Sequence, residues 1–289
     1  MSRILSYIDF VMNEGGKVFK HDIRPVSATE AADTVKFLCA HLFTKLNLKE
    51  GDDIIEVGSA AAGKPESHDL DFVYDLPSIR RRLGTEDAHK RFFDRVKMEL
   101  PDARMNLVDG FGITSVAYPV AGEEDKGFVQ VDFIPVESMD WARFTYQQSK
   151  DSNYKSAHRN WLLSAMCAEK MSHMKRADGE LISWDGYMFD IQRGFFEVSK
   201  SRAGVQPGKI LKEPKKVDSK FITTDPGIFL SYMFTDTVEP KDVESFESLW
   251  RIMVKDDKWK EKIPRVAKEL DKFLRRVGLD VPEEIKPYL

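Results

Sequence analysis

The chain contains very little cysteine: only Cys39 and Cys167 occur among its 289 residues, and each lies in an apolar run typical of a helix. Two such cysteines suggest neither a disulfide framework nor a zinc site, so we expect buried thiols in a reducing, cytoplasmic compartment. No apolar run is long enough to cross a membrane. The first residues carry charges and lack a small-residue cleavage site, so we expect no signal peptide.

The sequence also lacks an excess of positive charge and the common nucleotide-binding loops. Its net charge is −4, so a nucleic-acid partner could be held only by a local basic patch. Gly58 and Gly63 have the spacing of a P-loop, but Pro65 follows Lys64 where a P-loop has serine or threonine. There is no G-x-S-x-G elbow, Rossmann fingerprint or internal repeat. These signatures therefore do not account for the function of the chain.

The first half of the sequence predicts a small mixed sheet with helices packed against it. Residues 27–47 have helical apolar spacing, and Ser27 with Glu30 forms a capping box at their start. We expect strands over residues 53–59 and 71–76. Residues 77–101 should then be helical, in two pieces separated around Gly84. Two further β-rich runs, 113–120 and 128–136, flank a glycine- and acid-rich loop and predict a hairpin.

The second half has a different pattern, and we place a domain boundary near residue 150. Residues 156–175 predict a helix, and short strands are expected at 180–184, 187–192 and 194–200. The lysine-rich segment 202–220 predicts a surface loop that either contacts nucleic-acid phosphates or is simply solvated. We therefore expect an α+β domain over residues 1–150 and a mostly helical domain with a short β-rich insertion over residues 151–289.

Two carboxylates in the segment GSAAAGKPESHDLDFV suggest a cation site. Asp69 and Asp71 alternate with apolar residues, and residues two apart in a strand share a face, so both carboxylates point the same way. Neighbouring carboxylates repel unless a hard divalent cation lies between them. Gly58 allows the backbone to approach a ligand closely, and Ser59 offers a hydroxyl and an N–H group to a phosphate oxygen. A phosphate beside a metal is the layout for phosphoryl or nucleotidyl transfer.

A third aspartate strengthens this interpretation. Asp132 is a lone acid in the apolar run FVQVDFIPV, where an unpaired charge is costly. It alternates with valine and phenylalanine, so it shares a strand face with Gln130 and Ile134. If this strand pairs beside the one that carries Asp69 and Asp71, the three carboxylates meet. Three such carboxylates could hold two metal ions roughly 3.5–4 Å apart.

The Gly-Ser pair, the D-x-D pair nine residues further on and the later VDFIP together resemble the DNA polymerase β-like nucleotidyltransferase superfamily. The segments VGSAAAGKPESHDLDFV and VDFIP are most similar to the CCA-adding, poly(A)-polymerase and oligoadenylate-synthase-like branch of this superfamily, and the likeness covers roughly residues 25–140. The resemblance implies a palm domain, a nucleoside triphosphate held through two Mg²⁺ ions by Asp69 and Asp71, and Asp132 completing the second metal site. Gly58 and Ser59 would contact the triphosphate.

The helix after the palm often lends basic residues to the triphosphate in this superfamily. Lys155 and Arg159, at the start of the helix expected from Ser156, are therefore candidates for contacts with the β- or γ-phosphate. His158 lies between them and could equally be structural. The run Arg80–Arg82 could contact nucleic acid or triphosphate, or could be a solvated helix face with acids nearby.

These residues favour an Mg²⁺-dependent nucleotidyltransferase that moves a nucleoside monophosphate from a triphosphate to a hydroxyl and releases pyrophosphate. An RNA 3′ end is the expected acceptor, and a small molecule, a nucleotide or a protein side chain remain alternatives. A non-catalytic nucleotide-binding module and a metal-dependent phosphodiester hydrolase are two further hypotheses. The base preference, the acceptor and the oligomeric state are not indicated by the sequence.

Overall fold

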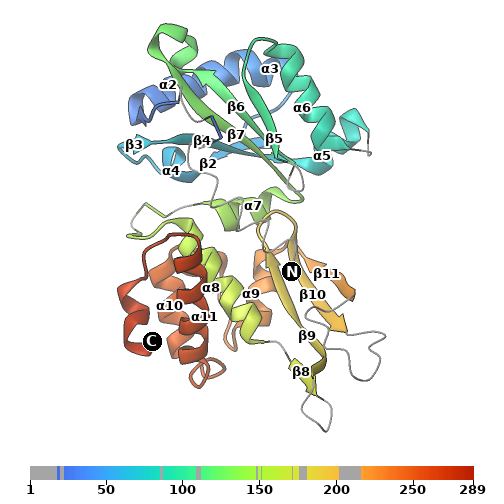
Figure 1. Ribbon diagram of the computed structural model, residues 1–289, viewed down its shortest axis with the longest axis vertical. Coiled ribbons are helices and arrows are strands. Elements are labelled where there is room, and N and C mark those ends of the chain that lie inside the picture. The colour runs from blue at the N-terminus through green and yellow to red at the C-terminus, as the bar shows by residue number, and fades with distance from the viewer. Residues whose placement is uncertain are drawn as a thin grey trace, which may run out of the picture. The chain divides into compact units, whose positions relative to one another are not determined.

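The computed structural model of the chain describes residues 18–19, 23–84, 87–108, 112–147, 149–150, 152–170, 172–175, 181–201 and 216–289. The chain divides into two compact units. The first unit comprises residues 1–152 and 276–278, and the second comprises residues 153–275 and 279–289. Each unit has its own β-sheet, and Figure 1 labels their elements.

A five-stranded mixed sheet forms the centre of the first unit, with strand order β2-β4-β7-β6-β5. Its strands are β2 (Ile54–Val57), β4 (Asp69–Asp75), β5 (Met105–Val108), β6 (Ile113–Pro119) and β7 (Phe128–Val136). The central pair β4 and β7 is parallel, and the other neighbours are antiparallel. A second, two-stranded sheet pairs β1 (Val26–Ser27) with β3 (Glu66–Ser67).

The helices of this unit begin where the sequence provides caps. Ser27 and Glu30 form the expected capping box at the start of α2, and the Asp75 carboxylate accepts a hydrogen bond from the N–H of Ser78 at the start of α5. The segments are α2 (Ala28–Leu38), a π-helical turn (Cys39–Phe43), α3 (Thr44–Leu46), α4 (Gly58–Ala61), α5 (Leu76–Leu83), α6 (Ala88–Glu99) and α7 (Met139–Tyr146). Two 3₁₀ turns, Val120–Gly122 and Glu124–Lys126, connect β6 to β7.

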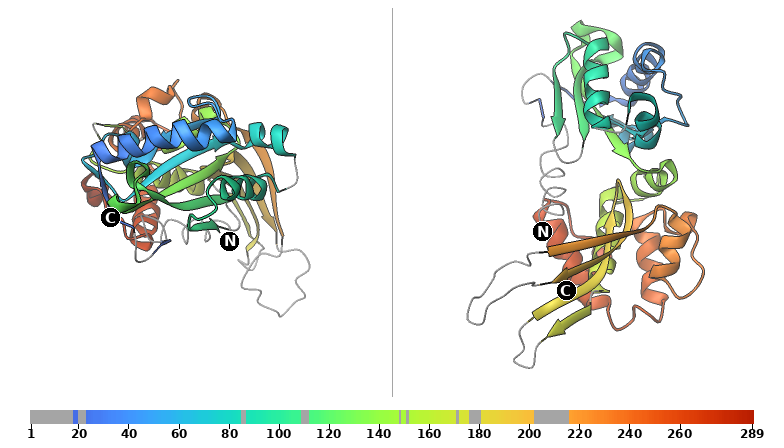
Figure 2. Two further views of the ribbon diagram at one scale, coloured as in Figure 1. Left: turned by 90° about the horizontal axis from the view of Figure 1, so that it is seen from above. Right: turned by 90° about the vertical axis from the view of Figure 1, so that its right-hand side faces the viewer.

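The two faces of the five-stranded sheet differ in their covering. On one face α2, the π turn and α6 pack over a core that includes Phe43, Phe72, Phe92 and Phe133 (Figure 2). On the other face a smaller core around Val73 lies against α7. The alternation expected for β7 is confirmed, because Phe133 packs in the first core and Ile134 in the second. This second face also carries polar positions: Asp69 and Asp71 of β4, paired with Gln130 and Asp132 of β7.

The second unit combines helices with a four-stranded antiparallel sheet of order β11-β10-β9-β8. Its strands are β8 (Ser172–Lys175), β9 (Leu181–Asp190), β10 (Gly194–Ser201) and β11 (Lys216–Thr223). Its helices are α8 (Ser156–Glu169), α9 (Pro226–Met233), α10 (Phe246–Lys255) and α11 (Ile263–Arg276), with 3₁₀ turns at Pro240–Val243 and Glu283–Tyr288. Phe189 and Phe195 of the sheet pack on Phe229 of α9.

The predicted α+β class is confirmed by the mixed sheet, its flanking helices and the helices that follow. The helix expected over 156–175 was too long, because α8 ends at Glu169 and residues 172–175 form β8. The loop expected over 202–220 was partly wrong, because residues 216–220 belong to β11. Residues 202–215 lie outside the described residues. Among the described helices, none has the length and apolar character that a membrane span requires.

Candidate metal centre

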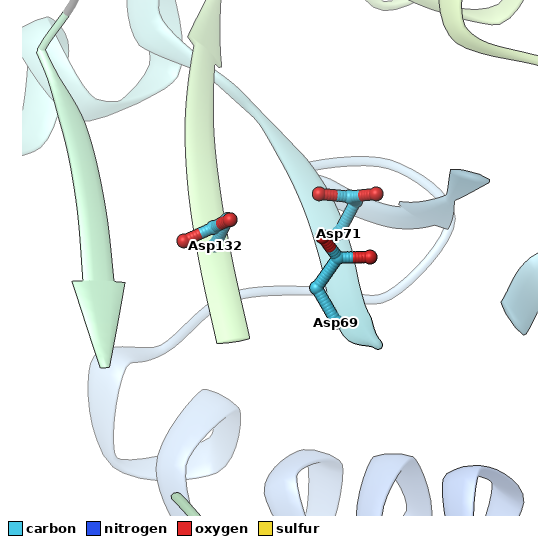
Figure 3. A group of neighbouring side chains, drawn as sticks. All are labelled: Asp69, Asp71 and Asp132. Carbon is cyan, nitrogen blue, oxygen red and sulfur yellow. The ribbon is translucent and has the colours of Figure 1, made fainter. Parts of the chain in front are cut away.

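Three aspartates from two neighbouring strands meet at one end of the five-stranded sheet. Asp71 of β4 pairs in register with Asp132 of the parallel strand β7, and Asp69 lies two residues before Asp71 on the same face. Each of the three offers one carboxylate oxygen, and these oxygens all lie within 4.8 Å of one another. Figure 3 shows the three side chains gathered on one side of the two strands. The structure thus brings together the three carboxylates that the sequence singled out.

This cluster is unfavourable for negative charge. Burial raises the pKa of Asp71 well above its usual value, and the neighbouring Asp69, Asp132 and Glu56 raise it further. Burial also raises the pKa of Asp132 to about 7, although the Ser115 hydroxyl and the Gln130 amide lower it; Asp69 raises it slightly further. Asp132 is only 1% exposed. Without a positive partner, the site therefore retains protons at neutral pH that carboxylates in water would have lost.

The two carboxylate oxygens of Asp132 differ in their hydrogen bonding. The side-chain amide of Gln130 donates a 2.8 Å hydrogen bond to Asp132 Oδ2. Asp132 Oδ1 is buried and has no partner at normal hydrogen-bond geometry in the described part of the chain, although the hydroxyl of Ser115, its paired residue on β6, lowers the pKa of Asp132. Leaving a buried acceptor unpaired costs about 1–3 kcal/mol, and more for a charged group. The unpaired oxygen is therefore a position where a cation would be stabilised.

The donor set fits a hard divalent cation. Mg²⁺ and Ca²⁺ prefer oxygen ligands at about 2.0–2.6 Å, so two ligand oxygens on one ion are separated by no more than about 5 Å. The spacing of the three carboxylate oxygens, at most 4.8 Å, satisfies this limit. A bound cation would reduce the repulsion among the carboxylates and pair with the free oxygen of Asp132.

Gly58 lies against the metal-ligand candidate Asp71. Its φ is +77°, in the left-handed region, and a Cβ atom built on it would collide with the Asp71 carboxylate. Only glycine therefore fits this close approach without displacing Asp71. Gly58 begins α4, so the strand expected over 53–59 ends at Val57, and its last two residues instead start a short helix.

Ser59 is partly exposed and its hydroxyl lies 2.9 Å from the hydroxyl of Ser67 in β3. A hydroxyl that shares one hydrogen bond can still accept or donate another, so a phosphate contact by Ser59 is compatible with this pairing. Ser67 was not identified from the sequence, because nothing in a serine eight residues further along indicates that it folds back on Ser59. Gln130, by contrast, could have been identified from its place two residues before Asp132.

Lys155 and Arg159 both belong to the second unit and have different environments. Lys155 is exposed and occupies the N-cap position of α8. Arg159 is only 2% exposed, and its Nη1 group donates to the backbone carbonyls of Val243 at 3.4 Å and Glu244 at 3.0 Å. Burial lowers the pKa of Arg159 to about 10. These contacts favour a structural role for Arg159, and a phosphate contact by Lys155 stays a prediction.

The arginine run in the last turn of α5 is paired with acids. Arg80 makes a bidentate contact with Glu137, at 2.6 and 2.8 Å. Arg82 contacts Asp53 at 2.8 Å, and Arg81 lies 3.7 Å from Asp75. These contacts agree with the interpretation of the run as a helix face with acids nearby.

The comparisons with known proteins leave the family open. A scan against protein-family models finds no match, and a search of curated proteins finds none either. Among solved structures, polymerase beta of Leishmania infantum in a ternary P/T complex is a match. The alignment covers 99% of this chain and 87% of the polymerase chain. The sequences are 14% identical in this alignment, and the TM-score is 0.40. A likeness of this size identifies neither an activity nor a substrate.

Proposed function

We propose that the protein is an Mg²⁺-dependent nucleotidyltransferase that transfers a nucleoside monophosphate from a nucleoside triphosphate to a hydroxyl acceptor. The observation that carries this proposal is the register of β4 and β7, which brings Asp71 beside Asp132 with Asp69 on the same face. The resemblance of the Gly-Ser, D-x-D and VDFIP segments to polymerase β-like nucleotidyltransferases supports it. An RNA 3′ end is the acceptor that we favour, and the CCA-adding and poly(A)-polymerase-like branch is part of the proposal.

Each site residue has a proposed part in this reaction. Asp69 and Asp71 hold the metal-bound triphosphate, and Asp132 completes a second metal site and orients the acceptor hydroxyl. Gly58 lies beside Asp71, and Gly58 and Ser59 contact phosphate oxygens. When bound, Mg²⁺ supplies positive charge that offsets the charge of the phosphates. The chain itself contributes position and charge complementarity, which are the main sources of catalysis in phosphoryl transfer.

The bond changes of the proposed reaction are simple. The acceptor oxygen forms a bond to the α-phosphorus in line with the leaving group, and the bond between the α-phosphorus and the bridging oxygen breaks. Pyrophosphate leaves with that oxygen, and the hydroxyl proton is lost to solvent. No oxidant or additional reactant is required.

Incubation with each α-labelled nucleoside triphosphate, Mg²⁺ and total RNA tests the proposal. We expect label to appear in RNA and pyrophosphate to be released, and both signals to disappear in Asp69→Asn and Asp132→Asn. Asp125→Asn is the matched control, because Asp125 is an exposed acid in the connection between β6 and β7. It should retain full activity.

Two other outcomes would contradict the proposal. Nucleoside triphosphate binding without turnover on RNA, nucleotide, small-molecule or protein acceptors would indicate a binding module. Shortening of the RNA without labelling, lost in the same two variants, would indicate a phosphodiester hydrolase. Labelling of a non-RNA acceptor would preserve nucleotidyl transfer but overturn the RNA assignment.

A further inference from the structure

We propose that three lysines of the second unit bind a phosphate group of a polynucleotide. Lys170 lies at the C-terminal end of α8, and Lys258 and Lys262 lie in the turns between α10 and α11. This cluster, the Lys170 cluster, contains none of the aspartates of the metal centre. The inference therefore does not depend on nucleotidyl transfer.

Two of the three ammonium groups meet at the end of α9. The Nζ groups of Lys170 and Lys258 both donate to the backbone carbonyl of Tyr232, in the case of Lys258 at 2.9 Å. Lys262 is near enough for its charge to act on Lys170. Two of the lysines also lie over aromatic rings: Lys170 Nζ is 5.6 Å from the centre of the Tyr187 ring, and Lys262 Nζ is 5.6 Å from that of Trp259.

No carboxylate balances this charge in the described part of the chain, where none lies within ion-pair distance of the three lysines. Glu169 pairs with Arg265 at 2.9 Å. The Asp256 carboxylate is occupied by backbone N–H groups, those of Thr235 at 2.7 Å and Lys258 at 2.8 Å. The cluster therefore has an excess of positive charge.

Two further neighbouring side chains, a thiol and a phenol, carry no negative charge at neutral pH. Burial raises the pKa of the Cys167 thiol to about 12, and burial together with Glu197 raises the pKa of the Tyr187 phenol. The C-terminal end of α9 contributes only about −0.5 of an elementary charge. One lysine would be enough to satisfy such a helix end, so capping of α9 does not explain three.

The surroundings of Lys170 disfavour its charged form. Burial lowers the pKa of Lys170 to about 8, and repulsion from Lys258 and Lys262 adds to this effect. An anion bound between the lysines would remove the repulsion. Phosphate oxygens accept short, charge-assisted hydrogen bonds from ammonium groups, so a phosphate is a suitable ligand.

The aromatic surroundings favour a polynucleotide over a free phosphate. Tyr232, whose carbonyl anchors two of the lysines, is 38% exposed and packs edge-on against Tyr187 at a centroid distance of 5.9 Å. Single-stranded nucleic acids are commonly bound by a cationic surface next to aromatic side chains on which bases stack. Lysines beside an exposed tyrosine provide both elements in one place.

Fluorescence anisotropy with a labelled single-stranded RNA of about 15 nucleotides tests the proposal at several salt concentrations, without Mg²⁺ or nucleoside triphosphate. We expect the double variant Lys258→Gln/Lys262→Gln to bind about tenfold more weakly. The slope of log affinity against log salt should fall by roughly one to two. The matched control, Lys260→Gln/Lys272→Gln, should bind as the unchanged protein does, because these exposed lysines are paired with Asp257 and Glu269.

A single variant separates binding from folding. Lys262 donates no hydrogen bond to the Tyr232 carbonyl, so Lys262→Gln should keep its melting temperature and still lose affinity about threefold. Unchanged affinity in both lysine variants would overturn the proposal, as would failure of the unchanged protein to bind the RNA. Binding of inorganic phosphate or pyrophosphate alone would overturn the polynucleotide assignment. Asp132→Asn should bind the RNA normally, whether or not the protein proves to be a transferase.

Discussion

Asp71 and Asp132 occupy paired positions on the parallel strands β4 and β7, so two carboxylates that are distant in the sequence share one end of the sheet. Parallel strands in register place equivalent side chains side by side on the same face. This arrangement is stable only if protons or a cation offset the charges.

The first prediction concerns Asp132→Asn. The amide is close in size to the carboxylate and removes a buried charge, so we expect the metal-free protein to melt several degrees higher at pH 8. Nucleotidyl transfer should fall at least 100-fold, because one metal ligand is lost. Thermal denaturation and label transfer measure the two effects. A variant that gained stability while keeping full activity would remove Asp132 from the proposed site.

The second prediction concerns pH. An unperturbed aspartate has a pKa of 3.8, whereas the pKa of Asp132 in the folded protein is about 7. Between these pH values the folded state therefore holds a proton that the unfolded state has lost. The stabilising contribution is therefore complete below about pH 4 and is lost as the pH rises to 7. Without metal, we expect the melting temperature to fall between pH 5.5 and pH 8.

Mg²⁺ should reverse this fall, because its binding requires the deprotonated carboxylates. The increase in melting temperature on adding Mg²⁺ should be larger at pH 8 than at pH 5.5. Asp132→Asn should have a shallower pH dependence. A residual slope should remain from Asp71, whose pKa burial raises well above its usual value, and from Glu56, whose pKa burial and Glu50 raise to about 6. An Mg²⁺ effect that is equal at both pH values would contradict a carboxylate metal site.

The third prediction compares two glycines. Gly58 and Gly63 both have positive φ, +77° and +69°, so alanine at either position should cost about 1–2 kcal/mol of backbone strain. A Cβ at Gly63 would meet nothing within 4 Å, whereas one at Gly58 would collide with Asp71. We expect only Gly58→Ala to weaken Mg²⁺ binding, by tenfold or more, as measured by titration calorimetry. Equal weakening by both variants would show that general strain is responsible.

The fourth prediction separates Lys155, the N-cap residue of α8, from Arg159 inside that helix. Lys155 is exposed, so Lys155→Gln should fold normally and raise the dissociation constant for nucleoside triphosphate severalfold. Arg159→Met should lower the free energy of unfolding by about 1–3 kcal/mol, because two backbone carbonyls lose their donor. Nucleotide titration and denaturant unfolding provide the measurements. Weaker nucleotide binding in a fully stable Arg159→Met protein would restore the phosphate role of Arg159.

Some elements of the fold were predictable because their signals are local. The capping box at Ser27, the break at Gly84 and the alternation along β7 depend on neighbouring residues, and all three appear in the structure. The strand β5 (Met105–Val108) was not predicted from the sequence. The strand β11 was missed because its lysines suggested a solvated loop, although edge strands often carry lysine.

The sequence by itself determined which aspartates share a strand face, because alternation in a strand is a property of adjacent residues. It also showed that Asp132 is a lone acid in an apolar run. Only the tertiary structure decided that β4 pairs with β7 in the register that joins Asp71 to Asp132, because that register depends on packing of the whole sheet. The same holds for the Lys170 cluster, in which Lys170 and Lys258 come from separate segments and meet at one carbonyl of α9.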